Sequence, residues 1–175
     1  MFFKKLFIAL ILIFWVSCSD TEPKVGPDKS EMYFMAGYSK VFQSAVLVLK
    51  DVADQIQPEA GIIVARMGRL HYPSSDEERK ILLLYADSLE VERVLADRSR
   101  AAPIELGGGV LVRVEVTYTF IVQRVGPFGL FGTKVIVEPS IRGYRSGYWD
   151  WVNFKSNGLI EKIYLTSIAQ KVRGK

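Results

Sequence analysis

The chain has 175 residues, 49% of them hydrophobic, with 23 basic and 19 acidic side chains and a formal net charge of +4. This length and apolar content suit one compact domain with a substantial hydrophobic core. Basic residues are interspersed with acidic ones instead of forming the dense basic face of a nucleic-acid-binding protein, so we expect no nucleic-acid partner.

The first seventeen residues have the pattern of an export signal. Lys4 and Lys5 precede an unbroken apolar run of eleven residues from Leu6 to Val16. As a helix this run rises only about 16 Å, roughly half of the hydrocarbon thickness that a spanning helix must cross. A charged start, a short apolar middle and a small residue at position 17 predict a signal peptide over residues 1–17. Its removal lowers the formal net charge from +4 to +2.

The stretch Trp15-Val16-Ser17-Cys18 resembles the signal of bacterial lipoproteins, in which the cysteine becomes the lipidated first residue of the mature protein. Trp15 departs from the leucine or other aliphatic residue that is usual there. The resemblance implies a lipid anchor on Cys18 and a periplasm-facing place in the cell envelope, and Ser19 favours the outer membrane over the inner one. An ordinary cleaved signal and an uncleaved anchor are the alternatives. The polar, proline-containing residues 18–29 then predict a flexible tether.

Residues 30–175 are expected to form a single domain that begins with a helix. Apolar residues recur at intervals of three and four from Phe34 to Ile56. With Ser30 as the cap, this pattern predicts a helix that begins at Glu31 and ends at Pro58.

A short strand and a second helix are expected next. The apolar run within Gly61–Met67 predicts the strand. Ser75 and Glu78 have the spacing of a capping box, which predicts a helix from there to about Arg98.

The second half of the chain has the period of strands. Apolar and polar residues alternate from Val110 to Gln123, which predicts a long antiparallel strand. Another is expected from Lys134 to Tyr148, with Pro139 at a bulge or an edge. Asn157-Gly158 is the preferred pair for a two-residue turn and predicts a hairpin between strands over residues 151–155 and 159–166. The sequence therefore predicts an α+β domain, with two N-terminal helices packed on a curved antiparallel sheet formed mainly by the C-terminal half.

Two further resemblances concern the fold. The strand over residues 112–120, Leu130-Phe131-Gly132 and the strand up to Arg142 resemble the C-terminal hairpin of TadE-like pilus-assembly proteins, which carry a full membrane helix at the N-terminus. The order of helices first and sheet last, ending in a hairpin over residues 154–163, is similar to cone-shaped NTF2-like domains. The second likeness is architectural and implies no function.

No residue pattern predicts catalysis. The chain has one histidine, His71, and lacks the Gly-x-Ser-x-Gly motif of serine hydrolases. Gly107-Gly108-Gly109 is not followed by the Lys-Ser/Thr pair of a phosphate-binding loop. We therefore expect no enzymatic activity, no cofactor and no metal site.

Two segments are candidate contact surfaces. The loop 126–132 places Phe128, Leu130 and Phe131 among glycines, where they either contact a bilayer or partner or fold back over the sheet. The stretch 142–151 interleaves arginines with Tyr144, Tyr148, Trp149 and Trp151. Such residues make good binding surfaces, although core packing explains their alternation equally well.

The first functional hypothesis is a non-enzymatic, membrane-anchored envelope lipoprotein that binds another envelope component, in a secretion or appendage assembly. It predicts exposed aromatic side chains in one of the two candidate segments. The alternative is a periplasmic domain that binds a small ligand, or a hydrolase. A cavity lined by polar groups such as His71, Arg113 and Glu115 would support that alternative.

Overall fold

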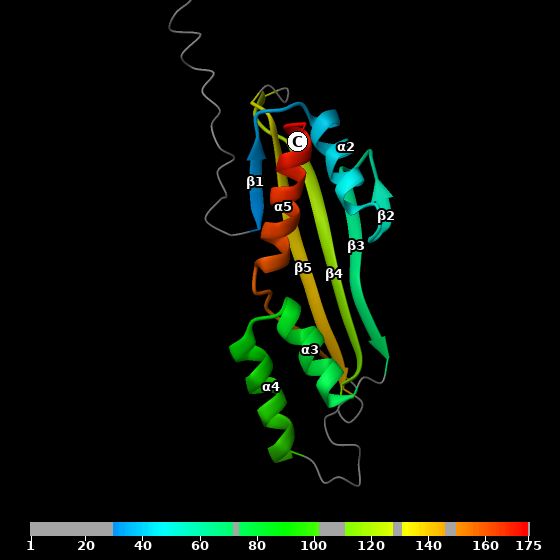
Figure 1. The fold of residues 1–175 in the computed structure, drawn as a ribbon, viewed down its shortest axis with the longest axis vertical. Coiled ribbons are helices and arrows are strands. Elements are labelled where there is room, and N and C mark those ends of the chain that lie inside the picture. Colours follow the sequence, from blue (N-terminus) through cyan, green and yellow to red (C-terminus); the bar gives the residue numbers. More distant parts are fainter. Residues whose placement is uncertain (1–29, 72–73, 102–110, 128–130, 146–149, 175) are drawn as a thin grey trace, which may run out of the picture.

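The computed structural model describes residues 30–71, 74–101, 111–127, 131–145 and 150–174, which form an antiparallel sheet with helices over one face (Figure 1). The elements in chain order are β1 (Glu31–Phe34), α2 (Tyr38–Leu49), β2 (Ala53–Gln57), β3 (Ile62–His71), α3 (Ser75–Tyr85), α4 (Ser88–Ala101), β4 (Leu111–Arg124), β5 (Thr133–Arg145), β6 (Asp150–Phe154) and α5 (Leu159–Val172). The sheet order is β1-β5-β4-β3-β2, and β6 also pairs with β5. The predicted α+β class is confirmed.

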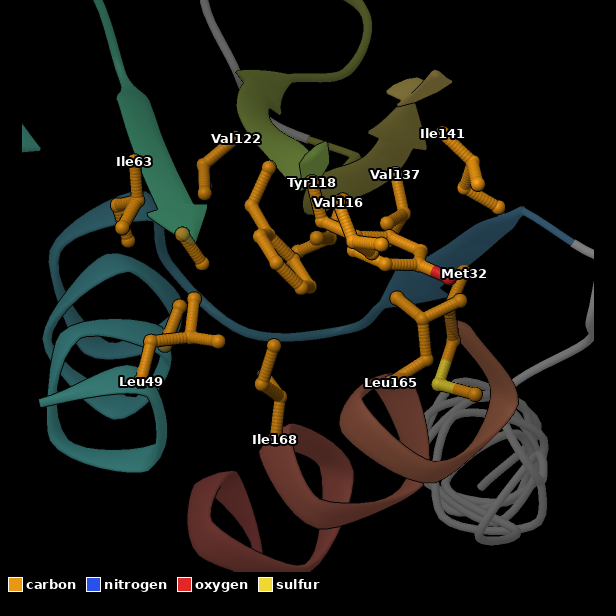
Figure 2. Close-up of a cluster of buried hydrophobic side chains, with 14 of the residues drawn as sticks. Met32, Leu49, Ile63, Val116, Tyr118, Val122, Val137, Ile141, Leu165 and Ile168 are labelled. Carbon is orange, nitrogen blue, oxygen red and sulfur yellow. The ribbon is translucent and has the colours of Figure 1, made fainter. Parts of the chain in front are cut away.

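The predicted alternation of β4 positions the core. Val114, Val116, Tyr118, Phe120 and Val122 face the helices and are buried. In Figure 1, α2 and α5 lie over one half of the long sheet and α3 over the other. Figure 2 shows side chains of α2 and α5 meeting those of the strands in one apolar cluster. Burial of each large apolar side chain contributes about 1.5–3 kcal/mol.

The predicted first helix is wrong at both ends. Residues 31–34 form strand β1, because Met32 and Phe34 are buried with the period of two that a strand requires. The helix itself begins after Gly37 and ends at Leu49. The residues after this helix, which were predicted to extend it to Pro58, form strand β2 instead. Ile56 of this strand is 43% exposed.

The predicted second helix is two helices. Ser74 caps α3, and its capping-box partner is Glu77, one residue before the predicted pair. The chain leaves the helix at Ala86, and the Asp87 carboxylate accepts the Leu89 and Glu90 amides, both at 3.1 Å, so that α4 begins anew.

The β5 strand passes through Pro139 without interruption, as predicted. Strand β5 has two partners on the edge away from β4. β1 pairs with β5 as far as Ile136, and β6 pairs with β5 from Ile141 onward. Pro139 therefore lies in the gap between these two partners, where the missing amide removes no ladder hydrogen bond.

The predicted C-terminal hairpin is wrong. Strand β6 is present, but residues 159–172 form the helix α5, whose inner face buries Leu165, Ile168 and Val172. Gly158 has the expected positive φ of 76°, yet it begins a helix and not a second strand. The helices are thus not all N-terminal, and β1, β2 and β3 place much of the sheet in the first half of the chain.

Candidate binding surface

The face of the sheet opposite α2, α3 and α5 carries the alternate residues of β4. Arg113, Glu115, Thr117 and Thr119 are all half-buried there, beside neighbours from β3 and β5. Among the described residues, the apolar core lies on the helix side of the sheet. Around Arg113 and Glu115, this open face therefore presents polar groups that are partly accessible.

Glu115 lies at the centre of a row of arginines on the open face. Backbone pairing places Arg69 of β3 and Arg142 of β5 directly across from it. Its Oε2 accepts from Nε and Nη2 of Arg142 at 3.0 and 2.7 Å. Its Oε1 pairs with Nη2 of Arg113 and lies 3.6 Å from Nε of Arg69. Three guanidinium groups thus share one carboxylate, and these four residues together have a formal charge of +2. We call these four residues the arginine cluster.

The carboxylate at the centre of the arginine cluster is held ionised. Burial raises the pKa of Glu115, but the hydrogen bond from Arg142 and the positive charges of Arg113 and Arg142 outweigh burial, and the pKa lies below its ordinary value of 4.5. A charged Glu115 therefore orients the guanidinium groups throughout the neutral pH range.

Trp151 of β6 extends the arginine cluster into an aromatic platform. It lies opposite Tyr144 of β5, with the two ring centroids 5.3 Å apart. The guanidinium carbon of Arg142 is 4.4 Å from the Trp151 centroid, and that of Arg113 is 5.8 Å away. Cation–π contacts of this kind fix long arginine side chains in place. Trp151 is still 37% exposed, so the platform has area left for a partner.

One hydrogen-bond donor of Arg113 has no partner in the part of the chain that the structure describes. Its Nε is buried and has no hydrogen-bond acceptor among the described residues. Removing a buried donor from water without a partner costs free energy, about 1–3 kcal/mol for a typical group.

The structure places some of the predicted contact residues and not others. Tyr144 and Trp151 come together in the platform. In the other candidate segment, the loop 126–132, Phe131 is 63% exposed and its ring lies against the backbone of Gly126. The remaining predicted residues, Cys18, Phe128, Leu130, Tyr148 and Trp149, lie outside the described residues.

The polar groups expected to line a ligand cavity lie elsewhere. Arg113 and Glu115 belong to the open face, and His71 is the exposed backbone partner of Arg113 at the end of β3. Sequence reasoning missed Arg69 as a member of the cluster. Only the strand register brings it beside Glu115, and the bulge between Arg66 and Gly68 shifts that register by one residue.

Within the described ranges, no helix is long and apolar enough to cross a membrane, and no group of acidic, histidine or cysteine side chains could hold a metal ion. No family model, curated protein or solved structure matches the chain.

Proposed function

We propose that this protein is a non-enzymatic, lipid-anchored envelope protein whose open sheet face binds an acidic segment of another envelope protein. The exposed Trp151, flanked by Arg142 and Arg113, carries this proposal. Tryptophan and arginine are the residues that most often dominate the binding energy of protein interfaces. The lipid anchor on Cys18, most consistent with the outer membrane, would hold this face close to other envelope components.

An acidic partner fits the charge of the surface. The arginine cluster has three positive charges and one negative charge, and its arginine side chains are between 34% and 46% exposed. Carboxylates can bind guanidinium groups in a bidentate manner, and electrostatic attraction increases the rate of encounter.

The binding half of the proposal is tested with poly-L-glutamate as a defined acidic probe. The full chain is labelled with ¹⁵N, and the indole N–H resonance of Trp151 is followed during titration. We expect a saturable shift that weakens with added salt and that Arg142→Gln reduces at least fivefold in affinity. Arg124→Gln, which removes one exposed charge at the far end of β4, is the matched control. Equal losses in both variants would contradict a specific surface.

The anchor half of the proposal is tested by intact mass of the membrane-extracted protein. We expect a chain that begins at a lipidated Cys18, and a Cys18→Ala version that stays unprocessed and carries no lipid. A wild-type chain that is cut elsewhere and carries no lipid would contradict the anchor. The titration with poly-L-glutamate does not depend on this result.

A further inference from the structure

A pocket of about 760 Å³ lies on the helix side of the sheet, away from the arginine cluster. It is formed where the hinge between α3 and α4, the start of α5 and the edge of β5 meet. Ser30, Leu83, Asp87, Pro139, Lys155 and Glu161 are among the residues that line it. Its volume lies in the range of small-molecule binding sites.

The pocket exists because the edge of β5 is interrupted. β1 leaves this edge after Ile136 and β6 joins it at Ile141, so that Pro139 forms part of the wall. The hinge is fixed beside this gap, because Asp87 N–H donates to the Lys155 carbonyl at 2.8 Å and Asn157 N–H donates to the Tyr85 carbonyl at 3.1 Å. Backbone hydrogen bonds thus hold the rim of the pocket in place.

Glu161 is a buried carboxylate in the wall of this pocket. It is 2% exposed, and its Oε2 has no hydrogen-bond donor among the described residues. Capping of α5 does not account for its position. Gly158 N–H already donates to the Ser156 hydroxyl at 3.1 Å, and Leu159 N–H donates to the Asn157 side chain at 2.9 Å.

The charge of Glu161 acts on a second buried polar group, the hydroxyl of Tyr118. The Tyr118 hydroxyl is buried and makes no hydrogen bond to the described residues. Figure 2 shows its ring among aliphatic side chains of the core. Burial, and secondly the charge of Glu161, raise the pKa of Tyr118, so it remains a protonated donor. The Ser156 hydroxyl acts in the opposite direction and lowers the pKa of Tyr118. This hydroxyl donates to the Tyr85 carbonyl and accepts from the Gly158 amide.

We infer that this pocket binds a small molecule that carries a primary ammonium group, with the Glu161 carboxylate as its counter-ion. A buried carboxylate is stable when it is paired with a positive charge and hydrogen-bonded, and an ammonium group supplies both. The lining supports a cation, because it contains the acidic residues Asp87 and Glu161 but the single basic residue Lys155. Amino acids and diamines share this ammonium chemistry, and Lys155 offers a second contact only to the carboxylate of an amino acid.

The test uses glycine and putrescine as ammonium probes and ethylene glycol as a probe without charge, each titrated into the ¹⁵N-labelled full chain. We expect a saturable shift of the Gly158 and Ser88 amide resonances with at least one ammonium probe and none with ethylene glycol. Glycine alone would identify a zwitterion site, and putrescine alone a diamine site. If neither probe binds up to 50 mM, or if ethylene glycol binds as well as they do, the inference is wrong.

Two variants assign the binding to Glu161. Glu161→Gln keeps the side-chain shape and should weaken ammonium binding at least tenfold, whereas Glu59→Gln in the exposed turn between β2 and β3 should have no effect. Leu83→Lys, at a partly exposed position of the lining, should also weaken binding because it places a competing ammonium at the pocket. The Leu83→Lys variant still tests the inference if Glu161→Gln does not fold. Unchanged affinity in a folded Glu161→Gln, or in Leu83→Lys, would overturn the inference.

Discussion

At the scale of single residues, Glu115 has the greatest influence on the open face. One carboxylate orients three arginines from three strands, and two of those arginines also contact Trp151. An ion pair between exposed side chains contributes little by itself, but Glu115 is only 14% exposed and shares its charge among several partners. Loss of this carboxylate would leave like charges facing one another.

We predict that Glu115→Gln lowers the free energy of unfolding by about 1 kcal/mol at pH 7, after allowance for the exposure of the arginines. Because the pKa of Glu115 is lower in the folded protein than its ordinary value of 4.5, its contribution is fully present above that value and is lost as pH falls through the folded pKa. The difference between the two proteins should therefore shrink as the pH is lowered through the folded pKa of Glu115. Urea unfolding at several pH values measures it.

The matched control for this prediction is Glu138→Gln, which removes an exposed carboxylate from the neighbouring strand. It should change the unfolding free energy little at any pH. A difference between wild type and Glu115→Gln that did not shrink at any acidic pH at which both proteins are folded would show that charge is not what the carboxylate contributes.

At the scale of elements, Asn157 determines where α5 begins and where α3 ends. Its Oδ1 accepts the Leu159 amide at 2.9 Å, and its Nδ2 donates to the Leu84 carbonyl at 3.0 Å. One side chain thus satisfies an amide at the start of one helix and a carbonyl at the end of another. The pair Asn157-Gly158 therefore has a capping role that a hairpin turn does not require.

We predict that Asn157→Ala destabilises the protein by about 1–2 kcal/mol, because both hydrogen bonds are lost. Chemical denaturation followed by circular dichroism measures the change. Asn153→Ala, at an exposed position of β6, is the control and should be nearly neutral. If the two variants lost the same stability, Asn157 would not have the capping role.

The elements also show which sequence patterns were informative. The alternation in β4 is strict over many residues and predicted both the strand and its buried face correctly. The first helix was predicted to be too long at both ends. Phe34 and Ile56 fit the spacing of three and four residues that predicts a helix, but both belong to strands. The break at Asp87 was missed because the flanking helices have compatible periods, and only the capping carboxylate marks it.

At the scale of the whole molecule, the class of fold was predictable and the candidate sites were predictable only in part. Tyr144 and Trp151 could be singled out because aromatic residues between arginines are unusual in composition. The partnership of Arg69, Glu115 and Arg142 depends on register across three strands, which a single sequence does not reveal. Glu161 was hidden for another reason, since the hairpin prediction placed it in a strand that does not exist.

The position of β1 has a consequence for how the chain folds. β3, β4 and β5 follow one another as antiparallel neighbours, whereas β1 must pair with β5 across about a hundred residues, from Glu31 to Ile136. Closing so long a loop costs more chain entropy than closing a hairpin, and contacts of this kind slow folding. We therefore expect the centre of the sheet to assemble before β1 is added. Ser30, which directly precedes β1, lines the pocket, so the docking of β1 also brings this residue to the pocket wall.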